Sequence, residues 1–315
     1  MEKPFRTYDE QIEILKGRGM VIEDATVATE ILANKNYYNI INGYKRLFLD
    51  PSSTAENEHY MKGTTLHEID SLFLFDSNLR IVCLKRILEV ELRMKSIIAY
   101  EFSNRYGYDD DKYLNPVNFS AAMPEHLSLD KMLKTVHDQK ADAMDSDNSS
   151  ILHYVNEHGY VPLWVLMNVL TFGAMAHFYA SMKLADRASV AKRFPMDQSE
   201  LNKILWALNY YRNCCAHGGR FYDFKVLHHP IPLTDLHKRL HLVYDRNLGY
   251  APGQNDFFAV IIILRLFIHP SDFQQTIREV SELLGTLERA LHTVSIAQVQ
   301  KMMGLPQGWD KLVTT

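Results

Sequence analysis

Apolar residues recur every three or four positions along most of this chain, which is the spacing of amphipathic helices. The longest such pattern begins at the capping sequence Thr65-Leu-His-Glu68, continues to about Tyr106 and stops at Gly107. Its apolar positions are Ile69, Leu72, Phe73, Leu79, Val82, Ile87, Val90, Met94 and Ile97. The pattern predicts one long helix over residues 65–106.

Shorter helical patterns lie on both sides of this long one. We expect helices at about 7–17, 24–49, 129–140, 161–173, 197–217, 233–245, 255–268, 272–292 and 295–303. Residues 109–128 and 141–150 are polar or contain proline, and we expect loops there, the second of them mobile. The chain shows no series of strands and no internal repeat, so the predicted fold class is all-α.

The polar stretch from Asp50 to Thr64 contains Pro51 and Gly63, and this composition is typical of a linker. It is the best candidate for a domain boundary. We therefore expect an N-terminal helical region over residues 1–60 and a larger helical domain over residues 61–315.

Composition narrows the class of protein. The chain has 315 residues, 47% of them hydrophobic and 23% charged, as expected of a globular protein with a sizeable core. The net charge of −4 does not favour a nucleic-acid binder, although a local basic patch is compatible with it. Three cysteines, two of them adjacent, indicate reduced thiols rather than a disulfide framework. The apolar run from Phe257 to Leu264 is too short to span a bilayer, so we expect a cytoplasmic protein without membrane association.

The helix predicted from Asp197 ends in the most unusual stretch of the chain, Ala207 to Arg220. Its apolar stripe consists of Leu201, Ile204, Leu205, Leu208, Tyr211 and Cys215. Arg212 falls on this stripe, whereas Asn213 and His217 lie together on another face, four residues apart. Gly218 and Gly219 follow and are typical of a helix C-terminus. A helix with neighbours on both faces is expected at a bundle centre or a subunit interface.

These residue types suit cleavage of RNA by its own 2′-hydroxyl group. The hydroxyl needs a base, the leaving 5′-oxygen needs an acid, and the phosphorane needs cationic donors. His217 could serve as acid or base and Arg212 as the donor. One histidine cannot easily act on both sides of an in-line reaction, but two copies of the motif across a two-fold axis could. The Arg-to-His spacing alone is weak evidence, and a structural pairing of Arg212 with Glu91, with His217 capping the helix, stays open.

Two further segments are candidates for RNA contact. Residues 36–48 mix aromatic and basic side chains, among them Tyr37, Tyr38, Lys45 and Arg46. The long helix has a basic excess on its polar face, which includes Arg80 and Lys95. Arg220, after the two glycines, is a further basic candidate for RNA contact. The alternatives are rings packed on the protein body in the first case and an ordinary solvated face in the second.

Two other chemistries are less well supported. His237 and His241 stand four apart, but no metal-binding motif accompanies them, so we expect a solvated histidine-rich face and no metal or other cofactor. Cys214 and Cys215 lie near His217, but nothing marks either as a nucleophile.

At this point the sequence resembles a known family. The segment Arg212-Asn-Cys-Cys-Ala-His217, followed by Arg220, resembles the R-N-x-x-x-H motif of HEPN (higher eukaryotes and prokaryotes nucleotide-binding) proteins, specifically the bacterial Abi-like abortive-infection group. Further landmarks in the family's order are Lys3-Pro-Phe5 with Tyr8, Gln11 and Leu15; Asn36-Tyr-Tyr38 with Gly43-Tyr44; Phe75-Asp76 with Leu79-Arg80; Glu91 with Lys95; Pro162-Leu-Trp164 with Phe172-Gly173; and Gly304-Leu-Pro306 with Trp309.

The resemblance implies a HEPN-type helical bundle, a homodimer that pairs two motifs, and a metal-independent endoribonuclease in phage defence or a toxin–antitoxin system. It implies RNA as substrate and a bound noncoding RNA as a regulator. By motif match, Arg212, Asn213 and His217 would be catalytic, with Glu91 as the acidic residue of the earlier helix. One departure is Asn168, where similar proteins are expected to carry an acidic residue. The alternative function is a non-catalytic RNA-binding or interaction protein on the same scaffold.

Overall fold

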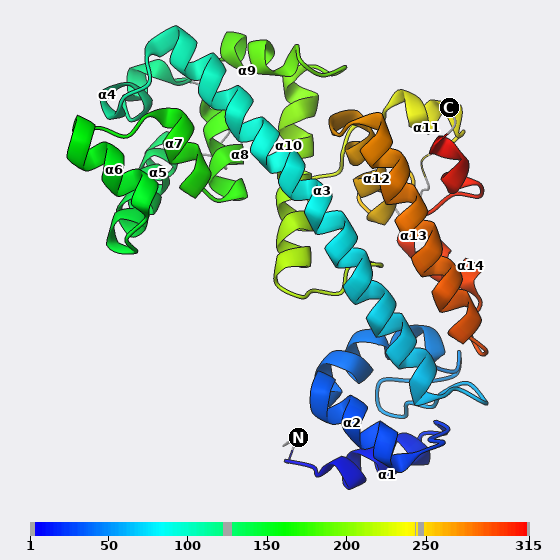
Figure 1. Cartoon of the computed structure of the whole chain (residues 1–315). Coiled ribbons are helices and arrows are strands. Elements are labelled where there is room, and N and C mark those ends of the chain that lie inside the picture. The colour runs from blue at the N-terminus through cyan, green and yellow to red at the C-terminus, as the bar shows by residue number, and fades with distance from the viewer. Residues whose placement is uncertain (1–3, 122–127, 243, 245–248, 314–315) are drawn as a thin grey trace. The chain divides into compact units, whose positions relative to one another are not determined.

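The computed structural model describes residues 4–121, 128–242, 244 and 249–313. Over these residues the chain folds into helices joined by turns and loops, with isolated β-bridges but no strand or sheet (Figure 1). The predicted all-α class is therefore confirmed. In the same residues, no helix is both long enough and apolar enough to cross a membrane.

The chain forms two compact units. The first contains residues 1–83, 214–224 and 271–315, and the second contains residues 84–213 and 225–270. Two helices, α3 (Leu66–Tyr106) and α10 (Gln198–Ala216), pass from one unit into the other. The α3 helix matches the long helix expected from the apolar pattern, and Gly107 follows it with a positive φ of 97°. The division at residue 60 stays a prediction.

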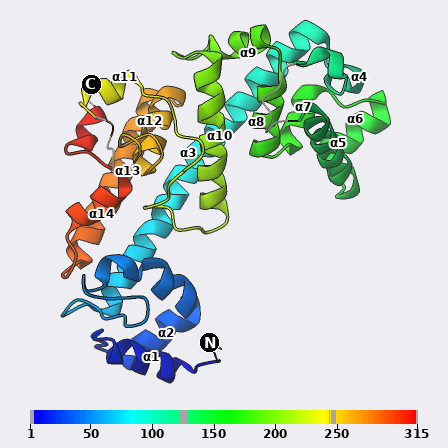
Figure 2. The same ribbon diagram turned by 180° about the vertical axis from the view of Figure 1, so that it is seen from behind.

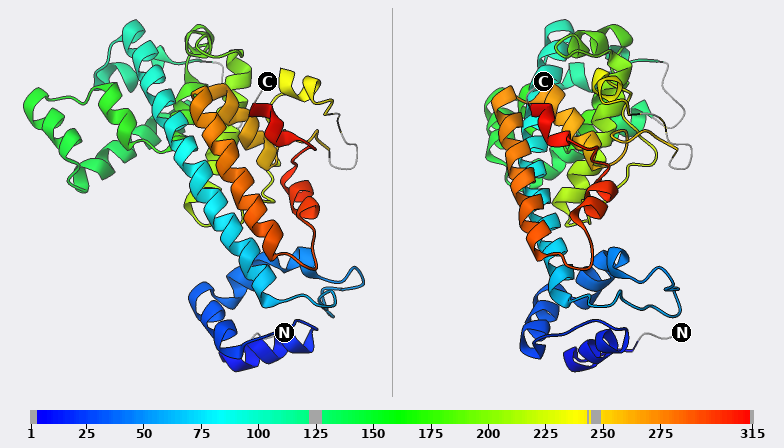
Figure 3. Two further views of the ribbon diagram at one scale, coloured as in Figure 1. Left: turned by 45° about the vertical axis from the view of Figure 1, so that its right-hand side comes forward. Right: turned by 90° about the vertical axis from the view of Figure 1, so that its right-hand side faces the viewer.

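In the first unit, the Thr7 side chain caps α1 (Tyr8–Gly17) and Glu10 completes the predicted capping box. The α1 helix packs against α2 (Ala25–Lys35), drawn in blue in Figure 3. The remaining elements of this unit are the π-helix η1 (Tyr38–Asn42), the 3-10 helix η2 (Lys45–Phe48), α13 (Pro270–Ala290), α14 (Ile296–Met303) and the 3-10 helix η4 (Trp309–Val313).

The helix expected over residues 24–49 is not continuous. It breaks at Asn36, which has a positive φ of 62° and accepts a hydrogen bond from the Tyr38 backbone amide at 2.9 Å. Asparagine tolerates this backbone conformation and competes for local backbone hydrogen bonds, so it ends α2 early. The two short helices that follow bury Ile40, Ile41 and Phe48, and Tyr44 between them is buried as well.

The second unit contains a cluster of short helices, drawn in green in Figure 2, in which α5 packs against α6, α7 and α8. Its elements besides α3 and α10 are α4 (Asp110–Tyr113), the 3-10 helix η3 (Pro116–Asn118), α5 (Leu129–Asp145), α6 (Ser149–His158), α7 (Leu163–Val169), α8 (Phe172–Ser181), α9 (Leu184–Ala191), α11 (Asp235–Arg239) and α12 (Phe257–Phe267).

Three expectations for this unit need correction. The helix over 161–173 is two helices, because the Thr171 side chain caps α8 by accepting from the Ala174 amide, while the Gln139 side chain accepts from the Thr171 amide. Residues 141–150 are mostly helical rather than loop, and buried Ala143 and Ile151 hold them in place. The loop over 109–128 contains two short helices, its last part lying outside the described residues.

The α3 helix begins at a buried carboxylate that also binds the segment after α13. Glu68 accepts from the backbone amides of His292 and Thr293 at 2.7 Å each, and from the Thr65 amide at 3.1 Å. Burial raises the pKa of Glu68, but the backbone hydrogen bonds from Thr293, His292 and Thr65 outweigh it and lower the pKa below its ordinary value. The ionised side chain therefore stabilises the first unit.

Replacing Glu68 with glutamine is expected to cost about 1–3 kcal/mol of unfolding free energy at pH 7. Because the folded-state pKa is lowered, this stabilisation is present above the unfolded-state pKa of about 4.3 and is lost as the pH falls through the folded-state value. Urea unfolding of both forms at pH 7, 5 and 3 should show the difference shrinking toward acid. A difference that stays constant over this range would contradict the assignment.

Candidate active site at the end of helix α10

The start of α10 is fixed by its capping box. Asp197 Oδ1 accepts from the amides of Ser199 and Glu200 at 2.7 and 2.8 Å, and Glu200 Oε2 accepts from the Asp197 amide at 2.9 Å. The predicted apolar stripe is buried at every position, namely Leu201, Ile204, Leu205, Leu208, Tyr211 and Cys215. Burial of this stripe fixes which way the other faces of α10 are directed.

The end of the helix depends on both glycines. Gly218 has a positive φ of 69°, a conformation that favours glycine. The Gly219 amide donates to the Cys214 carbonyl at 2.9 Å, and a Cβ at Gly219 would lie 2.9 Å from Cys214 Sγ. The chain therefore turns sharply just after His217, as the two glycines predicted.

The loop after the turn is held by a buried carboxylate, Asp76 of α3. It accepts hydrogen bonds from the backbone amides of Phe221 (3.1 Å) and Tyr222 (2.6 Å), and from the Tyr44 hydroxyl (2.7 Å). Arg80 forms an ion pair with it at 2.6 Å. Burial raises the pKa of Asp76, and the hydrogen bonds and the Arg80 charge oppose that rise. Asp76 thus anchors the segment that follows His217.

Arg212 lies beside two charged residues of α3. Its Nε is 3.6 Å from Glu91 Oε2, and Glu91 Oε1 is 2.7 Å from Lys95 Nζ. Arg212 Nε and Glu91 Oε2 are buried without a hydrogen-bond partner, whereas 29% of the Arg212 side chain is exposed. Glu91 therefore makes a close ion pair with Lys95 and a longer one with Arg212, whose side chain stays partly exposed.

Asn213 and His217 are both exposed. The Asn213 amide donates to Asn209 Oδ1, one turn earlier on α10, at 3.5 Å. Orientation of the His217 imidazole by Asn213 stays a prediction. His217 follows the last helical residue, Ala216, directly, so its side chain is placed at the helix terminus. Asn168, the noted departure, is exposed on α7 and donates to the Trp164 carbonyl at 3.3 Å.

The residues expected to touch RNA fall into two groups. Tyr38, 70% exposed, and Arg46 face solvent, whereas Tyr37 is partly buried. The other four basic residues make internal pairs: Arg80 with Asp76, Lys95 with Glu91, Lys45 with Glu58 and Arg220 with Asp223. Contact of any of them with RNA stays a prediction.

The alternative chemistries find little support in the geometry. Burial raises the pKa of Cys214 to about 12 and also raises that of Cys215, so neither thiol ionises near neutral pH. The expected solvated histidine face is wrong at His237, which is buried and whose Nδ1 accepts a hydrogen bond from the Thr234 amide. Among the described residues, no group of three or more His, Cys, Asp or Glu side chains is arranged to hold a metal ion.

Sequence reasoning missed an aromatic stack on α10. The His229 ring lies nearly parallel to those of Trp206 and Tyr210, with centroids 5.7 and 5.4 Å away. The four-residue spacing of Trp206 and Tyr210 indicated that the two rings share one helix face. The sequence did not show that His229, from a later loop, stacks on them. Trp206 and Tyr210 lie on the same helix as Asn213, about two turns and one turn before it.

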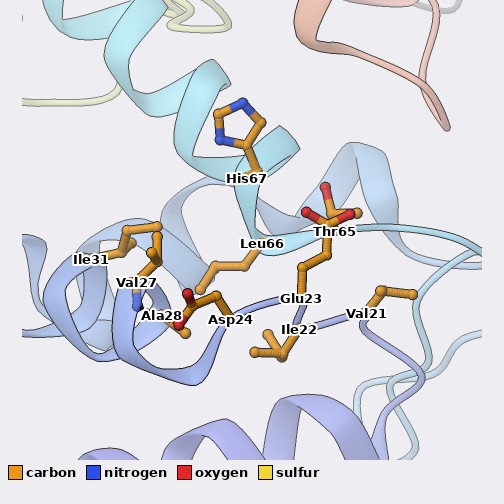
Figure 4. Close-up of a pocket in the computed structure, with 10 residues that line it drawn as sticks. All are labelled: Val21, Ile22, Glu23, Asp24, Val27, Ala28, Ile31, Thr65, Leu66 and His67. Atoms are coloured by element: carbon orange, nitrogen blue, oxygen red, sulfur yellow. Dashed lines mark hydrogen bonds between the residues drawn. The ribbon is translucent and has the colours of Figure 1, made fainter.

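A pocket in the first unit is lined by residues that lie far in the sequence from the motif at the end of α10. It has a volume of about 160 Å³ and lies where α2 and α3 begin (Figure 4). Its lining is Val21, Ile22, Glu23, Asp24, Val27, Ala28, Ile31, Thr65, Leu66 and His67. None of the expected catalytic or RNA-contacting residues lines it.

The fold and the helix terminus define an all-helical protein in which an Arg-Asn pair and a histidine flank the end of one helix. A family model for Abi-like proteins matches residues 30–223, which is more than half of the chain, so the chain belongs to the Abi-like protein family. Membership of this family suggests a role in abortive infection, a form of phage defence. Comparisons with curated proteins and with solved structures found no match.

Proposed function

We propose that this protein is a HEPN-type, metal-independent endoribonuclease of phage defence, with Arg212, Asn213 and His217 as its catalytic residues. The observation that carries the proposal is the arrangement at the end of α10: the partly exposed Arg212 side chain lies 3.6 Å from Glu91, and exposed His217 follows the helix directly. The motif lies inside the segment that the Abi-like family model matches.

The proposed chemistry uses the 2′-hydroxyl of RNA as the nucleophile. His217 takes the hydroxyl proton or gives a proton to the leaving 5′-oxygen, and the 2′-oxygen forms a bond to phosphorus as the 5′-oxygen leaves. Arg212 offers a planar, permanently charged fork to the phosphorane oxygens. The fork lies 3.6 Å from the Glu91 carboxylate, and 29% of the Arg212 side chain is exposed and so open to a substrate phosphate.

A second protomer would complete the site. His217 stands five positions after Arg212. A step of five residues turns a helix by about 140°, so two helical residues at this spacing would not share one face. Two copies related by a two-fold axis would supply two histidines, one as base and one as acid. We propose a homodimer for this reason. We further propose RNA as the substrate and a noncoding RNA as a regulator.

The purified protein is expected to cleave single-stranded RNA in the presence of EDTA and to leave 2′,3′-cyclic phosphate ends. Arg212→Ala is expected to lower the rate by about 10²-fold or more, because it removes the fork that stabilises the phosphorane. Arg212→Lys is the matched control, because lysine keeps the positive charge but lacks the planar guanidinium. Gel analysis with end-group mapping measures both effects. Binding of RNA without cleavage by any form would instead favour the non-catalytic alternative.

A further inference from the structure

Another pocket of the first unit lies between α1 and α2 and has a volume of about 560 Å³. It is lined by the residues just before α1, by α1 itself, by α2 and by the residues just after α2. Three aromatic rings belong to this lining, those of Phe5, Tyr8 and Tyr37. Pockets that bind small ligands have volumes of about 300–1,000 Å³, so this one is large enough for a compact organic molecule.

Local hydrogen bonds hold both ends of this lining in place. The Gln11 side chain donates from Nε2 to the Arg6 carbonyl at 2.9 Å, and the Gln11 backbone amide donates to the Thr7 carbonyl at 2.9 Å. These bonds hold the segment before α1 against the helix. At the other end, the positive φ of Asn36 ends α2 and turns the chain at Tyr37. The pocket is therefore formed before any ligand binds, which lowers the cost of binding.

Gln11 contributes a hydrogen-bond acceptor that is not used within the protein. A carbonyl oxygen accepts only from an N–H group, so the bond to Arg6 fixes the orientation of the Gln11 amide. The remaining atom, Oε1, is buried and has no hydrogen-bond partner among the residues that the structure describes. Gln11 as a whole is only partly buried, so a small side-chain movement opens this oxygen to a ligand. A ligand with an N–H group would satisfy it, whereas an aliphatic ligand would not.

The same lining contains a cation. Arg6 lines the pocket, and its Nη1 lies 3.4 Å from Glu10 Oε1, with about half of each side chain exposed. Exposed ion pairs of this kind contribute little, so a phosphate group can displace the carboxylate from the guanidinium. Glu10 keeps another partner, because its Oε2 accepts from the Thr7 amide at 2.9 Å. Aromatic rings, an unused acceptor and a cation therefore meet in one pocket.

We propose that this pocket binds one nucleotide, either free or as an unpaired nucleotide of an RNA strand. The base stacks on the exposed rings of Phe5 (88% exposed) and Tyr8 (44%) and donates an N–H group to Gln11 Oε1. Arg6 binds the phosphate. An aromatic side chain of a protein partner would also stack here, but it carries no anion for Arg6. The site is independent of the proposed ribonuclease function, since none of the candidate catalytic residues lines it.

The first test is calorimetric titration with AMP, GMP, CMP and UMP, which contain no phosphodiester bond and so cannot be cleaved. Tyr8→Ala is expected to weaken the affinity about tenfold, because a stacking ring is lost, whereas Tyr8→Phe should keep it. Phe5→Ala should act in the same direction, at a position too exposed to affect folding. The matched control is Tyr100→Ala, which changes an exposed tyrosine (60%) of α3 and should bind like wild type.

The second test separates the contacts of the phosphate and of the base. Wild type is expected to bind AMP about tenfold more tightly than adenosine, a difference of about 1.4 kcal/mol, and Arg6→Ala should bind the two equally. Gln11→Leu should weaken both ligands, because it removes the acceptor for the base. Equal affinities of wild type for AMP and adenosine would overturn the assignment of Arg6 to the phosphate.

A single-stranded RNA with 2′-O-methyl groups distinguishes the two sources of the nucleotide, because it lacks the attacking hydroxyl and cannot be cleaved. Binding of this RNA that is weakened by Tyr8→Ala, with no binding of mononucleotides, would show that the pocket takes a base within a strand. The proposal is wrong if neither probe depends on Tyr8 and Gln11, or if N-acetyltryptophanamide alone binds through them. A protein that binds these probes through the pocket but cleaves no RNA would refute the ribonuclease proposal only.

Discussion

Replacing His217 with alanine is expected to reduce RNA cleavage by roughly 10²–10⁴-fold, the usual contribution of a positioned general acid or base. The side chain is exposed and follows the end of α10, so its removal should leave the fold unchanged. Initial rates on a labelled single-stranded RNA, measured with EDTA present, test this expectation.

Another exposed histidine provides the control. His228 is also exposed, and His228→Ala should cleave RNA at the wild-type rate. Thermal unfolding of both variants should match that of the wild type, which separates loss of chemistry from loss of structure. Cleavage at the full rate by His217→Ala would remove the histidine from the mechanism, however well the motif fits.

Replacing Asp76 with alanine is expected to cost about 3–5 kcal/mol of unfolding free energy, the largest effect of any single substitution discussed for stability. The change removes the buried carboxylate that accepts from the Phe221 and Tyr222 amides and forms an ion pair with Arg80. Urea unfolding followed by circular dichroism measures the loss.

The same substitution should loosen the segment after His217. Amide hydrogen exchange at Phe221 and Tyr222 is expected to accelerate in Asp76→Ala, because Asp76 is the acceptor for both amides. Asp235→Ala is the control, since the Asp235 side chain is 89% exposed and its pairing with Lys238 contributes little. An Asp76 variant as stable as this control would show that the anchor is not needed for folding.

Local patterns predicted the helices well where capping and periodicity agreed. The long α3, the capping boxes at Thr7 and Asp197 and the apolar stripe of α10 were all visible in the sequence, because each depends on residues within a turn or two of one another. The breaks at Asn36 and Thr171 were missed, because in each case a side-chain hydrogen bond overrides a helical pattern.

The candidate site, too, could be predicted from the sequence only in part. The sequence by itself determined the all-α class, the Arg212-to-His217 motif and its glycine stop, since these follow from composition, spacing and local backbone preference. Only the tertiary structure decided that Arg212 lies 3.6 Å from Glu91, a pairing that the sequence left open, that Asp76 anchors the loop beyond the motif, and that the carboxylates paired with Arg80 and Lys95 are buried. The Arg212–Glu91 pair and the contacts of Asp76 with the loop join residues far apart in the chain, so packing and no local pattern fixes them. Arg80 and Lys95 each lie one helical turn from their carboxylate, a spacing that the sequence shows, but the burial of these carboxylates follows from packing.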